Sequence, residues 1–323
     1  MENQVYGKRC KGTSAHCTYD GGIMMTKSLV NESKSDLIFD RINIFIMICV
    51  LIIVLYPLYF IVIASISDPY AVNSGKVILF PKGITLEGYS RVFEHAPLWN
   101  GYKNTIIYTL LGTAINVILT LCGGYVLSRR DLVGRNFLSK FVVFTMIFNG
   151  GLIPRFLVVK NLGLYDSMWS LILPGAISVY NLIVCKSFFE STIPTELLDS
   201  AYIDGCNNIK FFIRIVLPIS PAIIAVLILF YAVGHWNSYF DALIYLKSPE
   251  KNPLQIVLRD LLVTFEVMQG DAVGDAGTLE AKQKIADIMR FAIIIVSSAP
   301  VIIIYPFLQK YFIKGIMVGS IKG

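Results

Sequence analysis

Long apolar runs alternate with short polar connections along most of the chain. A helix rises 1.5 Å per residue, so about 20 apolar residues are needed to cross a bilayer. We expect six membrane-spanning helices, over Ile42–Ile66, Thr105–Leu127, Leu138–Val159, Met168–Phe189, Ile219–Tyr245 and Phe291–Phe312. The pattern therefore predicts an all-α polytopic membrane protein with six transmembrane helices.

The third of these runs is the least regular. Its uncharged part, Phe141–Pro154, is too short to span alone, but Lys140 and Arg155 at its ends can extend their charged groups to the interface. The tripeptide Asn149-Gly150-Gly151 lies inside it. This tripeptide predicts a broken or closely packed helix.

The first 41 residues are polar and predict a cytoplasmic tail. Met24 and Met25 follow a Gly-Gly pair whose codons can contain a ribosome-binding sequence, so we hypothesise that the natural start is Met24 or Met25. No cleavage pattern follows the first apolar run, which should stay in the protein. The transmembrane domain then covers residues 42–318, and residues 319–323 form a cytoplasmic C-terminal tail.

Composition agrees with a membrane protein. The chain is 55% hydrophobic and 15% charged, with a mean hydropathy of +0.65, whereas a soluble domain carries about 25% charged residues. The net charge of +6 fits cytoplasmic Lys and Arg, and nothing suggests a nucleic-acid partner. The six cysteines show no metal-ligand spacing, so we predict no metal site.

Positive charge sets the predicted orientation. With the N-terminus inside, the inner segments hold 16 Lys and Arg residues and the outer segments hold 12. Four of the inner ones crowd the connection between the second and third spans: Arg129, Arg130, Arg135 and Lys140. We therefore expect both termini and the loop 190–218 in the cytoplasm. The loop 246–290 is then extracellular, and Gly270, Gly274 and Gly277 predict a flexible tip for it.

The stretch 196–218 has the pattern of two short helices around a glycine. Pro194 and Thr195 suit a helix start, and Glu196 and Asp199 complement the positive end of the first helix. Gly205 is the expected left-handed stop. Leu197, Leu198 and Ala201 predict an apolar face for this first helix.

For the second helix, Asn207 or Asn208 is the expected N-cap. Apolar residues at helical spacing predict its buried face: Ile209, Phe212, Ile213 and Val216. From this pattern alone, the segment is either a contact element for a cytoplasmic partner or an interfacial hairpin without a partner.

Catalytic motifs are absent from the sequence: it has no phosphate-binding glycine loop, zinc-protease motif or nucleophile elbow. Polar residues do occur near the outer end of the fifth span, beside His235. Intramembrane polar groups are candidates for a substrate path, although an aqueous cavity or the interface could equally solvate them. The candidates for this path are Trp236, Asn237, Tyr239 and Asp241.

The spacing of Asp199-Ser200-Ala201, Gly205 and Ile215-Val216-Leu217-Pro218 resembles the "EAA" loop of ABC importer permeases. Two of the first three positions differ from Glu-Ala-Ala, but the acid and the small size are kept. The stretches 235–240 and 309–323 resemble the MalG-like carbohydrate-uptake branch. Residues 149–154 and the large outer loop resemble its LplC- and YtcP-like subgroup, similar to oligosaccharide and alginate importers.

The resemblance implies a type I ABC importer permease fold and assigns roles to residues of this chain. The ATPase-coupling loop would comprise Glu196, Asp199, Ser200, Ala201, Asp204, Gly205, Cys206, Ile215, Leu217 and Pro218. A second ATPase contact would be made by the C-terminal residues Gly319, Lys322 and Gly323.

The resemblance also implies partners: a second homologous permease, a dimer of ABC ATPase subunits, an extracellular solute-binding protein, a sugar or oligosaccharide substrate and membrane lipid. ATP and Mg would be bound by the ATPases, so this non-catalytic subunit would hold no cofactor. Three alternatives remain: an ABC permease for a non-sugar solute, an ATP-independent secondary transporter, which should show internal repeats, and a membrane enzyme or scaffold.

Overall fold

A computed structural model describes residues 34–148, 150–270, 289–303 and 306. These residues form helices and connecting turns, with no strand among them. The chain divides into two compact units, Met1–Leu55 and Tyr56–Gly323, and each is described separately.

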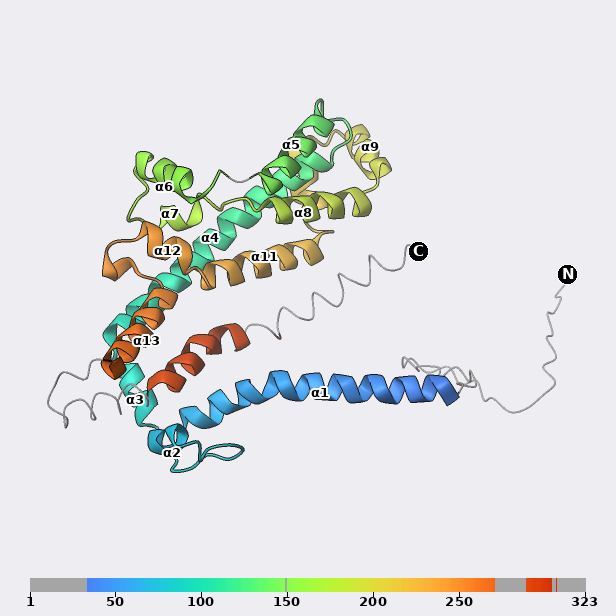
Figure 1. Cartoon of the computed structure of the whole chain (residues 1–323). Coiled ribbons are helices and arrows are strands. Elements are labelled where there is room, and N and C mark those ends of the chain that lie inside the picture. The colour runs from blue at the N-terminus through green and yellow to red at the C-terminus, as the bar shows by residue number, and fades with distance from the viewer. Residues whose placement is uncertain (1–33, 149, 271–288, 304–305, 307–323) are drawn as a thin grey trace, which may run out of the picture. The chain divides into compact units, whose positions relative to one another are not determined.

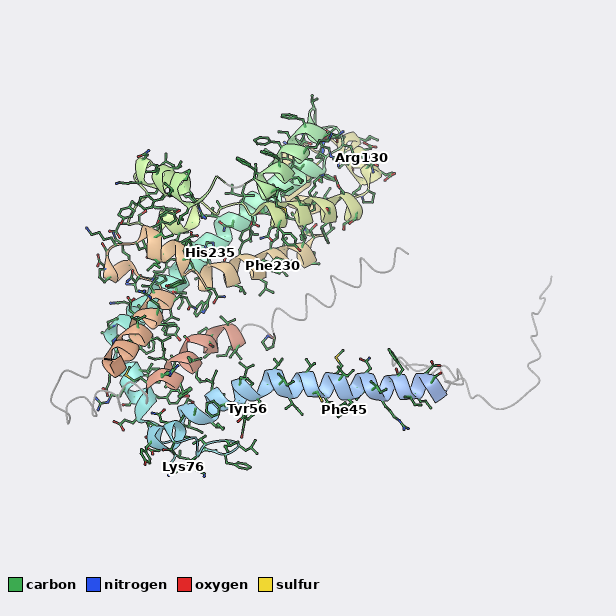
Figure 2. All side chains as sticks on the ribbon, in the orientation of Figure 1. Phe45, Tyr56, Lys76, Arg130, Phe230 and His235 are labelled. Carbon is green, nitrogen blue, oxygen red and sulfur yellow. The ribbon has the colours of Figure 1, made fainter. Side chains whose placement is uncertain are left out.

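The described part of the first unit is a single helix, which is the N-terminal part of α1 (Lys34–Ser65). The rest of α1 belongs to the second unit. Between Leu37 and Leu55 its large apolar side chains are exposed on every side, as Figure 2 shows around Phe45. Such a surface requires lipid or a protein partner. Helix α1 begins at Lys34, so residues 34–41 of the predicted cytoplasmic tail are helical, and the tail itself stays a prediction.

The second unit is organised along one long helix, α4 (Ala96–Ser128). Helices α8 (Val179–Thr192) and α11 (Pro221–Trp236) pack along it, as Figure 1 shows. Three short elements lie at the C-terminal end of α4: α9 (Thr195–Ile203), α10 (Asn208–Phe211) and the π-helical turn η1 (Phe212–Val216).

The other elements connect or cover this group. The short ones are α2 (Pro69–Asn73), α3 (Glu87–Glu94), α7 (Trp169–Ile172), α12 (Phe240–Tyr245) and the 3-10 turn η2 (Pro249–Lys251). The longer ones are α5 (Arg135–Ile147), α6 (Leu152–Asn161), α13 (Leu254–Gly270) and a helix over Met289–Ile303.

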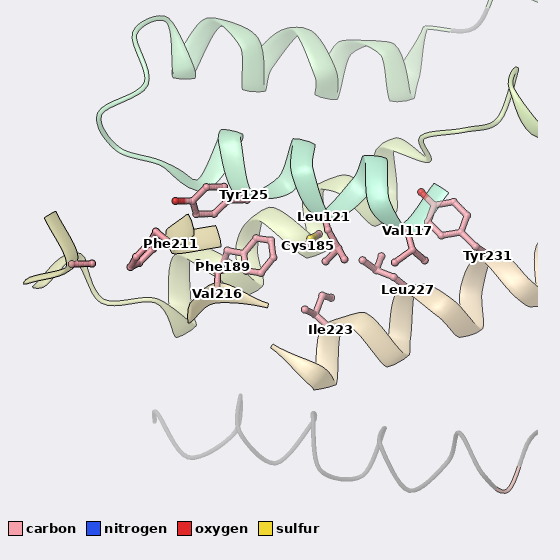
Figure 3. Packing of buried hydrophobic residues seen from close by; sticks show 11 residues of the cluster. Val117, Leu121, Tyr125, Cys185, Phe189, Phe211, Val216, Ile223, Leu227 and Tyr231 are labelled. Carbon is pink, nitrogen blue, oxygen red and sulfur yellow. The ribbon is translucent and has the colours of Figure 1, made fainter. Parts of the chain in front are cut away.

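Buried apolar clusters follow α4 from one end to the other. Near its start, Leu98 packs with Leu254 of α13 and with the helix Met289–Ile303. In its middle, Tyr108 packs with α7 and α12. Its C-terminal half contributes Val117, Leu121 and Tyr125 to a cluster with α8–α11, shown in Figure 3. One helix therefore positions both ends of the unit.

Polar side chains on α4 fix its neighbours as well. Asn116 Nδ2 lies 3.0 Å from His235 Nε2, and Thr120 Oγ1 lies 2.6 Å from the Tyr231 hydroxyl. In an apolar surrounding a buried polar group needs a partner, so each such pair favours one arrangement of the helices over others.

Two glycines let these neighbours approach α4 closely. A Cβ atom on Gly112 would lie 2.4 Å from His235 Nε2, and one on Gly124 would lie 2.7 Å from Cys185 Sγ. Gly112 therefore allows α11 to pack, and Gly124 does the same for α8. Small residues at helix contacts have this effect in membrane proteins generally.

Among the residues that the structure describes, two helices can span a membrane by length and composition, Ser35–Ser65 and Ala96–Ser128. Two bent pairs raise the total to four: Arg135–Ile147 with Leu152–Asn161, at 111°, and Asn208–Val216 with Pro221–Trp236, at 88°. The exact number of six stays a prediction, because the remaining expected spans are interrupted or only partly within the described ranges.

The interruptions have local causes. The third expected span breaks around Gly150-Gly151, where Gly151 has a φ of 87°. The fourth breaks between α7 and α8 at Pro174, since proline offers no N–H for a helix. The fifth ends its main helix at Trp236 and resumes at Phe240. Of the sixth, residues 304–305 and 307–312 lie outside the described residues.

The tight contact at Gly112 yields a prediction. Gly112→Val should cost about 1–3 kcal/mol, because the added carbons overlap the His235 ring that Asn116 orients. The melting temperature of the purified protein in detergent measures this loss. Gly234→Ala is the matched control, since a Cβ there meets nothing within 4 Å. Equal melting temperatures for Gly112→Val and wild type would contradict the close contact.

Candidate functional site

The predicted loop forms a compact helical hairpin, defined here as residues 195–218. Helix α9 begins at Thr195 as expected and contains four of the predicted residues, Glu196, Asp199, Ser200 and Ala201. The other predicted residues lie in the central turn and in η1 and the turn that follows it: Asp204, Gly205, Cys206, Ile215, Leu217 and Pro218.

Gly205 ends α9 in the left-handed conformation, with a φ of 70°. The amide of Cys206 donates to Ala201 O at 2.9 Å, and that of Gly205 donates to Tyr202 O at 3.0 Å. These bonds satisfy carbonyls at the helix end. A Cβ atom on Gly205 would meet nothing within 4 Å. The backbone angle, and not crowding inside this chain, therefore requires glycine here, and the space outside the turn is open.

The second half of the hairpin starts at a capped helix. The Asn207 side chain accepts a hydrogen bond from the Lys210 amide at 2.8 Å, so Asn207 is the N-cap. The helix then widens into η1, where the Leu217 amide donates to Phe212 O at 3.0 Å. This is the i to i+5 bond of a π-helix.

The wider turn changes which residues are buried. Phe211 and Val216, five positions apart, are both buried against Tyr125 and Phe189, as Figure 3 shows. The predicted face is wrong at Ile209 and Ile213, which are exposed, and correct at Val216 and in part at Phe212. In α9 the prediction holds for Ala201 and Leu198 but not for Leu197, which is exposed.

Three exposed isoleucines lie before and after Gly205 in the hairpin sequence. Ile203 is 86% exposed, Ile209 70% and Ile213 55%. We call these three residues the apolar rim. Single exposed apolar residues are ordinary, but three within eleven residues of one short hairpin are the kind of exposed apolar side chain that a protein contact covers.

Arg129, the C-cap of α4, links the hairpin to the long helix. Its Nη1 donates to the Tyr125 hydroxyl and to Asn208 Oδ1, both at 2.9 Å, and its Nη2 donates to the Tyr202 hydroxyl at 2.7 Å. The side chain is only 12% exposed. One guanidinium therefore contacts both α9, through Tyr202, and α10, through Asn208.

Asp131 completes this Arg129 network. It accepts hydrogen bonds from Nε at 2.7 Å and from Nη2 at 2.5 Å. These bonds raise the pKa of Arg129 further above its ordinary value and lower the pKa of Asp131. The guanidinium also lies 5.8 Å from the ring centroids of Tyr125 and Tyr202. A planar fork with five donors fits this site, whereas a lysine ammonium does not.

Sequence reasoning used Arg129 only as a charge that sets orientation, and it missed Tyr202 and Tyr125. One signal was available: an arginine directly after an apolar span, followed two residues later by an acid. Tyr202 gave no signal before the fold was known, because it lies 73 positions away from Arg129 in sequence.

A polar cavity of about 700 Å³ adjoins the hairpin. Its wall includes Arg130, Glu196 and the ion-paired residues Arg135 and Glu190, with Lys186 3.6 Å from Glu190. The cavity lies between the ends of α4 and α8 and the start of α9, so hydrated polar groups border the buried side of the hairpin.

The candidate substrate-path residues cluster where α11 gives way to α12. Trp236 is buried against Leu98 and α13, and Tyr239 is partly buried against the middle of α4. Asn237 receives a long hydrogen bond of 3.5 Å from Gln255. Asp241 pairs with Arg155 of α6, with Nη2 and Oδ2 3.3 Å apart. Two of the four are thus packed in apolar clusters, and Arg155 was missed as their charged neighbour.

Residues 246–270, the described part of the predicted extracellular loop 246–290, contain η2 and α13 and contact α4. The backbone of η2 accepts hydrogen bonds from Asn104 at 2.7 Å and Tyr108 at 2.9 Å, and the Leu254 amide donates to Thr105 at 2.8 Å. Helix α13 then packs on α4. Two of the three glycines of the predicted tip, Gly274 and Gly277, lie outside the described residues.

Asp166 holds this region in place from the connection between α6 and α7. Its carboxylate accepts hydrogen bonds from the amides of Lys247 and Ser248, from the Ser248 hydroxyl at 2.6 Å and from Lys251 Nζ at 3.0 Å. These bonds, above all those from Ser248, place the pKa of Asp166 well below its usual range. Its φ of 56° is one that aspartate tolerates.

Other predicted positions lie outside the described residues: Met24, Met25, Gly319, Lys322 and Gly323. Within the ranges that the structure describes, no group of three His, Cys, Asp or Glu residues could hold a metal ion.

Comparison with known proteins identifies relatives of this chain, although no family model matches it. The polygalacturonan/rhamnogalacturonan transport system permease protein YtcP of Bacillus subtilis (strain 168) is 43% identical over 288 residues, which cover 89% of this chain and 97% of that protein. Protein LplC of the same organism is 40% identical over 296 residues, covering 91% and 98%.

A solved structure gives the same result for the fold. The crystal structure of a bacterial ABC transporter involved in the import of the acidic polysaccharide alginate contains a chain with a TM-score of 0.79 and 35% identity to this one. The match covers 87% of this chain and 98% of that one. The fold is therefore that of an ABC importer permease, an integral membrane subunit.

The chain belongs to the MalG-like family of carbohydrate ABC transporter permeases. The predicted fold class and the resemblance are confirmed. The relatives are transport permeases and not enzymes, which confirms the prediction of a non-catalytic subunit.

The Arg129 network yields a prediction. Arg129→Lys should lower stability by about 1–3 kcal/mol and weaken the link between α4 and the hairpin, because lysine cannot reach Tyr125, Tyr202 and Asn208 together. The melting temperature and limited proteolysis within 195–218 measure both effects. The neighbouring Arg130 is exposed, so Arg130→Ala is the control and should change neither. Equal behaviour of the two variants would contradict the role of Arg129.

The Asp166 contacts yield a prediction about pH. Because the folded-state pKa is depressed, Asp166 stabilises the fold above its unfolded pKa of about 4, and this contribution is lost as pH falls through the folded value. Asp166→Asn should therefore lower the melting temperature at pH 7, and its difference from wild type should shrink below pH 4. Thermal melts over a pH series test this. A difference that stays constant across the series would contradict it.

Proposed function

We propose that this chain is one permease subunit of an ATP-driven importer of oligosaccharides, and that the hairpin 195–218 is its contact with an ATPase subunit. The family supports the import function, since relatives serve polygalacturonan/rhamnogalacturonan transport and a similar structure belongs to an alginate importer. The observation that carries the ATPase contact is the open turn at Gly205, together with the exposed apolar rim of Ile203, Ile209 and Ile213 in the same hairpin.

The assembly that fits this function has three kinds of partner protein. A second homologous permease shares the translocation path, two ATPase subunits bind ATP and Mg, and an extracellular solute-binding protein delivers the sugar. This chain itself binds no cofactor. Both termini and the hairpin lie in the cytoplasm, an orientation supported by Arg129, Arg130, Arg135 and Lys140 close to the hairpin end of α4.

The contacts suggest how force passes from the ATPase to the membrane. A movement of the docked hairpin pulls on Tyr202 and Asn208, and Arg129 transmits the pull to the end of α4. Since α8 and α11 pack along α4, they move with it as one body. Rigid-body motion of this kind suits a switch between inward- and outward-facing states.

The opposite end of α4 serves the binding protein in this account. Asn104, Tyr108 and Asp166 fix the start of residues 246–270, so α13 offers a firm base instead of a loose loop. Outside the described residues, Gly319, Lys322 and Gly323 are proposed to reach the ATPase interface.

The ATPase contact is tested with a matched pair of glycines. Gly205 and Gly163 both have a φ of 70° and open space at Cβ, so Gly205→Glu and Gly163→Glu carry the same backbone strain of about 1–2 kcal/mol. Gly205→Glu should reduce co-purification of the ATPase and oligosaccharide uptake at least tenfold, because a charge enters the apolar contact. Gly163→Glu should retain the ATPase. Equal ATPase recovery with both variants would overturn the docking role.

A further inference from the structure

Arg155 is a charged residue that neither the hairpin nor the packing of α4 explains. It lies in the second turn of α6, directly after the break at Gly150-Gly151. Its side chain is 43% exposed and pairs with Asp241 of α12, whose side chain is 32% exposed. The pair joins the third apolar segment to the substrate-path candidates of the fifth.

The pair is built differently from the Arg129 site. Arg155 makes one hydrogen bond to Asp241, from Nη2 to Oδ2 at 3.3 Å, whereas Arg129 donates five bonds to four residues. A single long contact between exposed groups stabilises a fold little. A guanidinium has five N–H donors, so Arg155 can also donate two hydrogen bonds to a second partner such as a carboxylate.

Arg155 also lines a cavity of about 490 Å³. That volume is within the range of small-molecule sites, which is roughly 300–1,000 Å³. The wall is made by the helix breaks at Gly150, Gly151 and Pro174 and by valine and leucine side chains, and Arg155 is its one charged lining residue. An apolar wall with a single cation suits a ligand that has a carboxylate on a ring with apolar faces.

We propose that Arg155 binds the carboxylate of a uronate-containing oligosaccharide during transport, exchanging Asp241 for the substrate. Asp241 then holds the guanidinium in place between transport cycles and returns to it on release. The proposal rests on the proposed oligosaccharide import. It agrees with the alginate importer, whose cargo is an acidic polysaccharide, and with the polygalacturonan relative.

The competing explanation is a fixed brace between α6 and α12. The two differ in a way that can be measured. If the ion pair only fixes α6 against α12, changing either residue should reduce transport equally, and the loss should be the same for every substrate. A carboxylate site loses only acidic substrates when Arg155 changes, and it gains affinity for them when Asp241 no longer competes.

The test uses the whole importer in proteoliposomes with two probes, trigalacturonate and its fully methyl-esterified neutral form. Arg155→Gln should raise the KM for the acid roughly tenfold and leave that for the ester unchanged, since one charge-assisted contact is lost. Asp241→Asn should leave or lower the KM for the acid. Arg155→Lys should give an intermediate value, because it keeps the charge without the fork.

An acid-to-ester ratio that stays the same in Arg155→Gln would overturn the proposal, as would equal loss of both probes in Arg155→Gln and Asp241→Asn. If the wild-type importer transports neither probe, the result contradicts the proposed import function independently of the Arg155 proposal. Carboxylate binding by Arg155 is then tested by the melting temperature of the purified full chain with trigalacturonate. A wild-type rise that Arg155→Gln removes supports the site, and no rise, or an equal rise, overturns it.

Discussion

The hydrogen bonds of Arg129 are the interaction on which the account depends. A guanidinium at the end of α4 contacts Tyr202 in α9 and Asn208 in α10, so both halves of the hairpin are tied to one helix end. Without this link the hairpin would be joined to the membrane segments through apolar packing and chain connectivity alone. Apolar packing permits sliding, whereas directional hydrogen bonds from one largely buried side chain favour one arrangement. The network therefore couples movement of the hairpin to movement of α4.

The same helix connects the hairpin to the opposite end of the unit. Its C-terminal half packs with the hairpin, its middle with α7 and α12, and its start with α13. Close contacts at Gly112 and Gly124 and polar contacts at Asn116 and Thr120 limit sliding of α8 and α11 along it. Movement at the hairpin end is thereby expected to reach the middle of α4, where α12 packs and where Asp241 of α12 pairs with Arg155 of α6.

Much of the hairpin could be predicted from sequence, because its signals are local. Pro194-Thr195, Gly205 and Asn207 each act within a few residues, and the structure places a helix start, a left-handed stop and a cap at these positions. The buried face of the second helix could not be predicted, since the π-helical turn shifts the spacing from 3.6 residues and exposes Ile209 and Ile213. The sequence singles out Arg129 and Asp241, but it does not predict their pairing with Tyr202 and Arg155, which are distant in sequence. The helix breaks at Gly151 and Pro174 were visible as residues, but their effect on the number of spans was not.

Amide hydrogen exchange in the assembled importer tests the central claim most directly, because it reports opening of the backbone segment by segment. Exchange across 195–217 is compared between the permease pair alone and the same pair bound to its ATPase. The account predicts that ATPase binding slows exchange at residues 202–213 and leaves residues 254–263 of α13 unchanged. Unchanged exchange in the hairpin, or slowing at α13 in its place, would contradict it.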